Sequence, residues 1–328
     1  MADSAAPVLE VRNLRVRFPL KRRGLFGAKS YLHAVDDVSF SVRRGATLGI
    51  VGESGSGKTT AALAAARLVD ACGGSVLLGG EDFLALQGEA LRRARAKIQF
   101  IFQDPYSSLN PRRRAAAVVR EPLDSLTSAA ADEKQQIVDR LFREVGLRQE
   151  QQRLFPHQFS GGQRQRIGIA RALATQPELI ICDEPVSALD VAVQAQILNL
   201  LRQLQSELGL TYLFISHDLG VVQHICDFVA VMYMGKIVEY GDRLSLFNKP
   251  RHPYTQALLS AVPSVDRKRR GQTRRGALSG DPPDPASPPP GCRFASRCPI
   301  AQPVCHERPP ALRQLAAGHA VACDFAED

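Results

Sequence analysis

No stretch of this 328-residue chain stays apolar over the roughly 18–20 residues that a membrane-spanning helix needs. Residues 1–7 are short and lack an apolar core, so no secretory signal is visible. No internal repeat is evident. Hydrophobic residues make up 45% of the chain and charged residues 23%, as in soluble globular proteins. We therefore expect a cytoplasmic protein with one large or two ordinary domains.

The net charge is +9, but no single long basic segment carries it. Short basic runs occupy residues 21–23, 112–114 and 267–270, and the remaining basic residues are scattered. A basic protein can bind nucleic acid or an anionic membrane surface. Scattered charge favours the simpler interpretation of a solvated surface.

The seven cysteines are unevenly placed, with three spread through the first 230 residues and four after residue 290. The dispersed ones are Cys72, Cys182 and Cys226, and the clustered ones are Cys292, Cys298, Cys305 and Cys323. In a cytosolic chain such a cluster indicates a metal or iron–sulfur site rather than disulfides. The spacings C-x5-C, C-x6-C and C-x17-C differ from the C-x2-C pattern of zinc ribbons. His306 and His319 could substitute as ligands, but they have no special spacing.

The clearest motif is GESGSGKT at residues 52–59, which fits the phosphate-binding pattern G-x-x-x-x-G-K-[ST]. The apolar segment 47–51 before it predicts a buried strand, and the alanine-rich segment 60–68 after it predicts a helix. Glycines let backbone N–H groups converge on a polyphosphate at the helix N-terminus. We expect Lys58 to reach the β- and γ-phosphates and the Thr59 hydroxyl to bind Mg²⁺. The simpler alternative is a glycine-rich turn between a strand and a helix.

Strand and helix patterns alternate along most of the chain, which predicts an α/β fold with a largely parallel sheet. The expected strands cover residues 8–18, 31–42, 47–51, 75–78, 98–102, 178–182 and 211–216, with a hairpin from 229–232 and 236–239. The expected helices cover residues 60–68, 89–96, 137–145 and 191–208. The opening strands favour an antiparallel subdomain, and residues 104–174 favour a helical insert in the α/β core. Residues 19–30 are expected to form a loop.

Four further features lie at strand ends or at a helix start. Asp183 and Glu184 follow an apolar strand, where they could hold Mg²⁺ and activate an attacking water. Residues 160–163, Ser-Gly-Gly-Gln, open a predicted helix as an anion-binding arrangement. Gln103 and His217 each end a strand, where they could reach the metal, the water or the γ-phosphate. Taken singly, each feature also fits an exposed acidic pair, a capped helix or a structural side chain.

Together and in this order, these motifs resemble the ATPase subunit of ABC transporters over residues 8–242. The resemblance implies a P-loop NTPase core with an antiparallel β subdomain and a helical insert. It implies catalysis by Glu184, His217 and Gln103, and Mg²⁺ binding by Thr59, Gln103 and Asp183. It implies ATP binding by Gly52, Glu53, Ser54, Gly55, Ser56, Gly57, Lys58, Thr59, Thr60 and Phe18. Tyr31 is the alternative to Phe18 as the aromatic that stacks on adenine.

The resemblance also implies a nucleotide-sandwich dimer with a second ATPase subunit on a separate polypeptide. In such a dimer Ser160, Gly161, Gly162 and Gln163 form a signature that closes over ATP bound to the partner. The segment Ser187, Ala188, Leu189 and Asp190 corresponds to the D-loop. Soluble ABC ATPases acting on nucleic acid are the distant alternative, but they usually carry two ATPase units or a long coiled-coil insert, and this chain shows neither.

The resemblance extends to one group of these transporters, the oligopeptide and dipeptide importers, through residues 102–111, 252–259 and 291–299. The segment at residues 163–166 resembles the second of the two ATPase subunits that these importers often use. This implies a heterodimer, two membrane permease subunits and, indirectly, an extracytoplasmic solute-binding protein, with no nucleic acid. It places the protein peripherally on the cytoplasmic face of the cell membrane. Peptides are the expected cargo, and nickel chelates, glutathione and opines are the alternatives served by similar subunits.

The expected division is an ATPase domain over residues 1–255 and a small C-terminal extension over residues 256–328. Within the extension, residues 267–290 are basic and then proline-rich, which predicts a linker or an extended segment. Relatives with a similar tail can carry a [4Fe–4S] cluster, which needs four thiolates. The hypotheses for the four tail cysteines are therefore an iron–sulfur cluster, a zinc ion or unliganded thiols.

Overall fold

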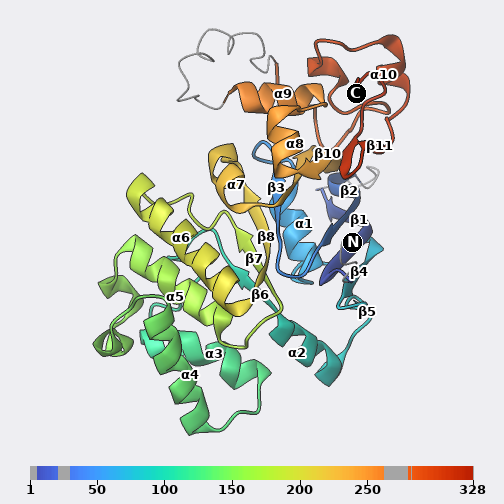
Figure 1. Cartoon of the computed structure of the whole chain (residues 1–328). Helices are drawn as coiled ribbons and strands as arrows, with labels where there is room; N and C mark the ends of the chain where they lie inside the picture. The colour runs from blue at the N-terminus through green and yellow to red at the C-terminus, as the bar shows by residue number, and fades with distance from the viewer. Residues whose placement is uncertain (1–5, 21–29, 262–279, 282, 328) are drawn as a thin grey trace. The chain divides into compact units, whose positions relative to one another are not determined.

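The computed structural model describes residues 6–20, 30–261, 280–281 and 283–327 (Figure 1). The chain divides into two compact units, which we describe separately. The first unit comprises residues 1–10, 41–47 and 77–215, and the second comprises residues 11–40, 48–76 and 216–328. Most of the predicted loop at residues 19–30 and most of the predicted linker at residues 267–290 lie outside the described residues.

Three parallel strands form the core of the first unit: β6 (Ile98–Ile101), β7 (Leu179–Asp183) and β8 (Thr211–Ser216). Ile98 pairs with Leu179, and Leu179 pairs in turn with Thr211. β7 and β8 are buried along their whole length, as expected of apolar strands in a parallel sheet that is covered on both faces. The carboxyl ends of β6 and β7 therefore lie along one edge of the sheet.

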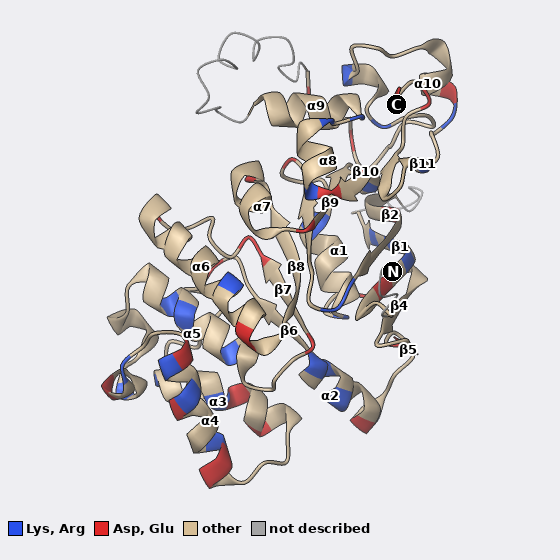
Figure 2. Cartoon of the chain, in the orientation of Figure 1, with Lys and Arg blue, Asp and Glu red and all other residues tan. Residues whose placement is uncertain are grey.

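The predicted helical insert is present in this unit. It consists of α3 (Ala115–Leu126), α4 (Ala131–Glu144), η1 (Gln149–Arg153), η2 (Pro156–Gln158) and α5 (Gly161–Leu173). α3, α4 and α5 pack against one another (Figure 1). The C-terminal part of α4 corresponds to the helix predicted over residues 137–145, and it buries Val138, Leu141 and Phe142 on one face. α4 carries both acidic and basic residues, whereas the charged residues of α5 are all arginines (Figure 2).

Two helices complete the described elements around this sheet. α2 (Gly88–Lys97) precedes β6, and α6 (Val191–Leu208) connects β7 to β8. Asp190 caps α6 by accepting a hydrogen bond from the N–H of Val193, and Gly209 ends the helix in the left-handed conformation. α6 has the residue limits that the sequence predicted.

The second unit contains β3 (Thr47–Val51), which runs parallel to β9 (Phe228–Tyr233). β9 and β10 (Lys236–Asp242) form the predicted antiparallel hairpin. The C-terminal segment adds β12 (His319–Val321) to β10, followed by β11 (Arg313–Ala316). The tail is therefore part of the sheet, which the sequence did not predict.

A second sheet contains β2 (Tyr31–Val42), β1 (Leu9–Pro19) and β4 (Gly73–Leu78) as neighbours, in that order. The short strand β5 (Glu81–Asp82) pairs antiparallel with the last two residues of β4. The α/β fold with an additional β subdomain and a helical insert is thus confirmed.

The remaining helices of the second unit are mostly short. They are α1 (Lys58–Ala65), α7 (Leu219–Ile225), α8 (Arg243–Asn248), α9 (Pro253–Ser260), η3 (Ala295–Arg297) and α10 (Pro303–Glu307). In the described part of the chain, no helix combines the length and the apolar character needed to cross a bilayer.

Candidate functional site

The phosphate loop occupies residues 52–57, between β3 and α1, as predicted. Two of its glycines have backbone conformations and surroundings that exclude a side chain. Gly52 has φ 153°, and a Cβ atom there would lie 2.1 Å from the carbonyl oxygen of Met232. Gly57 has φ 98°, and a Cβ atom there would lie 2.1 Å from the carbonyl oxygen of Ala34. The loop can therefore form only with glycine at these positions, because β9 and β2 approach it so closely.

Lys58, the first residue of α1, is 5% exposed and turns back over the loop. Its Nζ donates hydrogen bonds to the carbonyl oxygens of Gly52 and Glu53, both at 2.9 Å. The hydroxyl of Ser56 is buried and has no hydrogen-bond partner. A buried ammonium, an unsatisfied hydroxyl and a helix N-terminus at one loop suit a bound polyphosphate.

Glu53 connects the loop to the C-terminal segment of the same unit. Its backbone N–H donates a hydrogen bond to the hydroxyl of Tyr254 at 2.9 Å, so this N–H is already occupied. Its carboxylate accepts from Arg297 Nη1 at 2.9 Å and from Nη2 at 3.1 Å. These hydrogen bonds to Glu53 raise the pKa of Arg297 above its ordinary value. Sequence reasoning missed Tyr254 and Arg297, because nothing in their spacing links them to residue 53.

The first unit holds the predicted carboxylates at the carboxyl end of β7. Asp183 is 4% exposed and is the last residue of the strand. Glu184 follows with φ 44°, an uncommon left-handed conformation for a residue that is not glycine. The backbone holds it there, since its N–H donates to Ile215 and its carbonyl oxygen accepts from the N–H of Ser187. Gln103 Nε2 donates to Glu184 Oε2 at 2.9 Å, so the structure brings these two predicted residues together.

The Ser-Gly-Gly-Gln motif begins α5 in the same unit. Ser160 is the exposed N-cap, and its hydroxyl accepts a hydrogen bond from the N–H of Gln163 at 3.4 Å, while the Gln163 side chain returns to the N–H of Ser160. This is a capping box. A Cβ atom at Gly162 would lie 2.5 Å from Val193 on the first turn of α6. The start of α5 therefore lies against the start of α6, where Asp190 of the predicted D-loop is the cap.

The other predicted residues have simpler settings. His217 follows β8 and is exposed, and Thr59 and Thr60 lie in the first turn of α1 with intermediate exposure. The two candidate adenine-stacking aromatics are equally accessible, with Phe18 on β1 37% exposed and Tyr31 on β2 38% exposed. Exposure therefore does not discriminate between them. Phe18, His217 and the phosphate loop belong to the second unit, and Gln103, Asp183, Glu184 and residues 160–163 belong to the first.

The four tail cysteines line one small cavity of about 20 Å³. The backbone joins two of them, because the N–H of Cys292 donates to the carbonyl oxygen of Cys305 at 2.7 Å. Burial raises the pKa of the Cys292, Cys298 and Cys323 thiols. All four are free cysteines. Among the described residues, no group of three or more His, Cys, Asp or Glu side chains is arranged to hold a metal ion.

A parallel strand, a glycine-lined loop and a helix beginning with lysine define a P-loop nucleotide-binding protein. The helical insert, whose last helix, α5, begins with Ser-Gly-Gly-Gln, is typical of the ABC class within that group. Comparison with known families agrees: residues 35–187 match the family described as ABC transporter. Residues 238–305 match the C-terminal region of oligopeptide/dipeptide transporters.

Similar proteins cover nearly the whole chain. The oligopeptide transport ATP-binding protein AppF of Bacillus subtilis is 51% identical and aligns over 98% of each chain. The dipeptide transport ATP-binding protein DppF of Escherichia coli is 47% identical over 98% of this chain and 95% of its own length. This chain belongs to the ATP-binding proteins of ABC transporters, and it is an ATPase of that family.

Solved structures of ABC cassettes share the fold. A dimeric, post-hydrolysis structure of the cassette MJ0796 with ADP and phosphate aligns with a TM-score of 0.63 and 27% identity, covering 72% of this chain and 98% of that chain. The cbiO1 protein of Clostridium perfringens, part of the transporter complex cbiONQ, aligns with the same TM-score and 26% identity, covering 74% of this chain and 91% of that chain.

Proposed function

We propose that this chain powers the uptake of di- and oligopeptides as one ATP-binding subunit of an ABC importer. The observation that carries the proposal is the combination, in one chain, of a complete phosphate loop with the C-terminal region of oligopeptide/dipeptide transporters. Relatives with matching length are named for oligopeptide and dipeptide transport. Nickel and glutathione are the alternative cargoes.

The phosphate loop supplies the binding energy for ATP. Backbone N–H groups of the loop and of the first turn of α1, the Ser56 hydroxyl and the Lys58 ammonium hold the β- and γ-phosphates. The Thr59 hydroxyl, Gln103 and Asp183 offer the oxygen ligands that Mg²⁺ prefers, and the ion would neutralise charge that develops on the phosphates. The adenine stacks on Phe18 or, alternatively, on Tyr31.

Glu184 is the general base of the proposed site. Its carboxylate accepts a proton from the water that attacks the γ-phosphate, and the hydrogen bond from Gln103 orients it. His217 donates a hydrogen bond to the γ-phosphate. The left-handed backbone at Glu184 is consistent with this role, since such conformations cluster at functional sites.

Hydrolysis needs a second subunit in this proposal. The signature of this chain, Ser160, Gly161 and Gly162, closes over ATP bound to a partner ATPase. The partner's signature closes in turn over ATP bound to this chain. The D-loop, which ends at Asp190, lines the interface between the two subunits. A dimeric arrangement is recorded for the cassette MJ0796, which supports this model of assembly. We propose a heterodimer with a related ATPase subunit, docked on two permease subunits at the cytoplasmic face of the membrane. An extracytoplasmic solute-binding protein delivers the cargo, and nucleic acid takes no part.

The proposed domains are an ATPase domain over residues 1–255 and a C-terminal extension over residues 256–328. Within the extension, the four cysteines that line one cavity are the candidate ligands of a [4Fe–4S] cluster, although the described side chains do not form a site for a single metal ion. Anaerobically purified protein should then contain iron and acid-labile sulfide and absorb visible light. Cys298→Ser should lose both, whereas Cys72→Ser, at an exposed position outside this cavity, should keep both. Zinc, or no metal, in the wild-type protein would reject the cluster.

The transport function is tested by uptake of labelled di-, tri- and pentapeptides in the native cell. Wild type is compared with a strain carrying Glu184→Gln, and nickel uptake is measured beside it. Loss of peptide uptake alone supports the proposal, and the dependence on peptide length separates dipeptide from oligopeptide transport. Loss of nickel uptake alone would assign the chain to the metal branch. Unchanged uptake of every solute would remove the peptide assignment.

A further inference from the structure

Arg297 of the C-terminal tail forms a two-pronged ion pair with Glu53 of the phosphate loop. Nη1 lies 2.9 Å from Oε2 and Nη2 lies 3.1 Å from Oε1. The side chain of Arg297 is 5% exposed and that of Glu53 is 29% exposed. Two parallel hydrogen bonds between a guanidinium and a carboxylate fix geometry as well as charge. The pair therefore differs from an exposed salt bridge, which contributes little.

Two tyrosines surround this ion pair. The Tyr254 hydroxyl accepts the backbone N–H of Glu53, and Arg297 Nη1 donates to the Tyr233 hydroxyl at 3.2 Å. The Arg297 guanidinium also lies 5.8 Å from the centre of the Tyr233 ring, and the rings of Tyr233 and Tyr254 are 4.6 Å apart. Phe294, one turn before Arg297, packs edge-on against Tyr233. The tail is thus held to the loop by a packed aromatic cluster and not by the ion pair alone.

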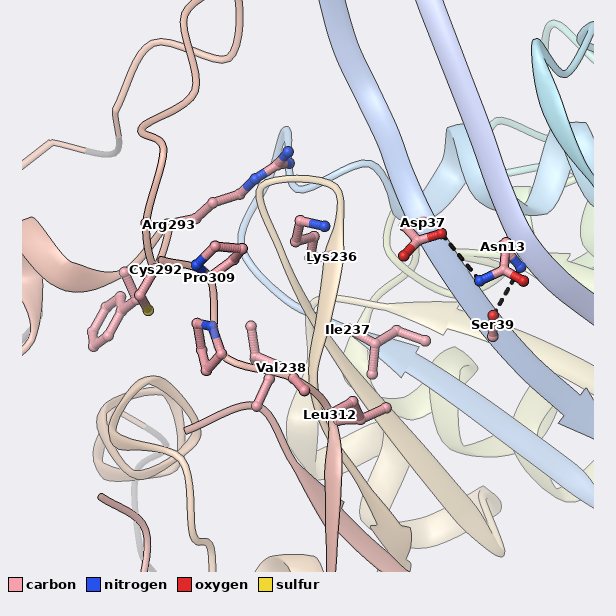
Figure 3. Close-up of a pocket in the computed structure, with 15 residues that line it drawn as sticks. Asn13, Asp37, Ser39, Lys236, Ile237, Val238, Cys292, Arg293, Pro309 and Leu312 are labelled. Atoms are coloured by element: carbon pink, nitrogen blue, oxygen red, sulfur yellow. Dashed lines mark hydrogen bonds between the residues drawn. The ribbon is translucent and has the colours of Figure 1, made fainter. Parts of the chain in front are cut away.

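A second tail arginine reaches the backbone that frames the loop. Arg293 is 7% exposed, and it donates to the carbonyl oxygen of Met234 and to the Asp36 carboxylate. Burial opposes ionisation of Asp36, but Lys236 and Arg293 together lower the pKa of that carboxyl. Figure 3 shows Arg293, Lys236 and Asp37 around one pocket of about 420 Å³.

Asp36 and Met234 are close in sequence to the two carbonyl groups that confine the loop glycines. Ala34 lies against Gly57, and Met232 lies against Gly52. The hairpin also touches the loop directly, because the N–H of Gly235 donates to the carbonyl oxygen of Ser56 at 2.8 Å. Arg293 therefore supports the walls of the phosphate loop, while Arg297 holds the loop itself.

The charge on Glu53 explains why such support is needed. A carboxylate in a loop that binds a polyphosphate repels the ligand, and the repulsion is strong where the surroundings exclude water. The guanidinium of Arg297 neutralises this carboxylate and turns it toward the tail. Without Arg297, the charge of Glu53 would stay uncompensated beside the phosphates.

We propose that the C-terminal tail braces the phosphate loop, and that Arg297 is the positioning residue through which the tail sets the affinity for ATP. The inference rests on the ATP site proposed above. It assigns to the tail a part in nucleotide binding within its own chain.

The test is a double-mutant cycle on the full-length protein, with the Kd for Mg-ATP measured by equilibrium titration. Arg297→Gln should raise the Kd by about tenfold, the effect of losing a charged hydrogen-bond pair. In a Glu53→Gln background the same substitution should raise the Kd by less than about threefold, because no carboxylate is left to neutralise. Arg297→Lys should bind Mg-ATP more tightly than Arg297→Gln but less tightly than wild type, since lysine keeps the charge but cannot form the two parallel hydrogen bonds.

Arg308→Gln is the matched control, because Arg308 also pairs with a carboxylate in the tail but is 69% exposed. It should leave the Kd unchanged. Equal losses from Arg297→Gln with and without Glu53→Gln would overturn the brace and indicate a merely structural arginine. An unchanged Kd for Arg297→Gln would overturn it as well. Failure of the wild-type protein to bind ATP would instead reject the proposed ATP site, so the two outcomes are distinguishable.

Discussion

Gln103 and Glu184, which are 81 residues apart in the sequence, are joined by a hydrogen bond of 2.9 Å from Nε2 to Oε2. The two residues follow neighbouring parallel strands, β6 and β7, whose carboxyl ends share one edge of the sheet. The hydrogen bond thereby joins an amide, whose oxygen could bind a metal ion, to a carboxylate that could accept a proton from a water molecule. The hydrogen bond fixes the orientation of the Glu184 carboxylate, which we propose as the general base.

Glu184→Gln should keep ATP binding and lose most turnover. The amide is nearly the same size as the carboxylate, so the backbone contacts with Ile215 and Ser187 survive. It cannot accept a proton, and loss of a general base lowers kcat by about a hundredfold or more. Single-turnover hydrolysis and ATP titration separate the two effects. Glu207→Gln, at an exposed position on α6, is the control. A parallel loss of binding and turnover would contradict the role.

Lys58→Ala should weaken nucleotide binding by about tenfold to a hundredfold, the range for losing charge-assisted hydrogen bonds. In the described structure the ammonium bonds to the carbonyl oxygens of Gly52 and Glu53, so its removal also frees the loop backbone. Titration with a fluorescent ATP analogue measures the loss. Lys97→Ala provides the comparison, because this lysine is 58% exposed and pairs with Glu178. An unchanged ATP affinity for Lys58→Ala would reject the assignment.

Ser160→Arg should bind ATP normally but fail to support hydrolysis in the assembled transporter. Ser160 is exposed at the start of α5, so a long side chain there projects outward and blocks closure over the partner's ATP. Loss of the cap itself costs about 1 kcal/mol, which Ser160→Ala reproduces without the bulk. ATPase activity of the reconstituted complex should therefore follow the order wild type, Ser160→Ala, Ser160→Arg. Full activity in the arginine variant would contradict closure of residues 160–163 over the partner's ATP.

Local sequence patterns were sufficient for the elements that carry the site. α6 and β8 have the predicted limits, because β-branched runs and a helix between Asp190 and Gly209 define them without help from the rest of the fold. The phosphate loop, the strand-end carboxylates and the helix start at Ser160 were also visible, since each depends on residues close together in the sequence.

Long-range pairings were not visible. The strands β11 and β12 are short, and β12 pairs with β10 only because the chain returns to this sheet from a distant part of the sequence. No local sequence pattern predicts that return. The ion pair between Glu53 and Arg297 spans 244 residues. Such contacts follow from tertiary packing, and a single sequence contains no signal that selects Arg297 over the many other arginines.

His252 introduces a pH dependence of stability. It is 2% exposed and caps α9, because its imidazole Nδ1 accepts a hydrogen bond from the N–H of Tyr254 at 3.0 Å. Its backbone N–H donates to the Glu239 carboxylate. Burial lowers the pKa of His252 from 6.5 to about 4, against the opposing effects of Glu239 and the backbone at Ala322. Between these two values the unfolded chain binds the proton and the folded chain does not. Stability should therefore be complete above about pH 6.5 and fall as the pH drops toward 4.

His252→Asn should reduce that loss, because asparagine retains a capping oxygen but does not titrate. The shift in pKa corresponds to at most about 3 kcal/mol between the two pH values. Urea unfolding of both proteins at several pH values gives the free energies of unfolding, and their difference at each pH gives the effect of replacing His252. The two curves should run parallel above about pH 7.5, where neither state protonates the imidazole. Parallel curves at acid pH as well would show that the buried imidazole does not cause the acid sensitivity.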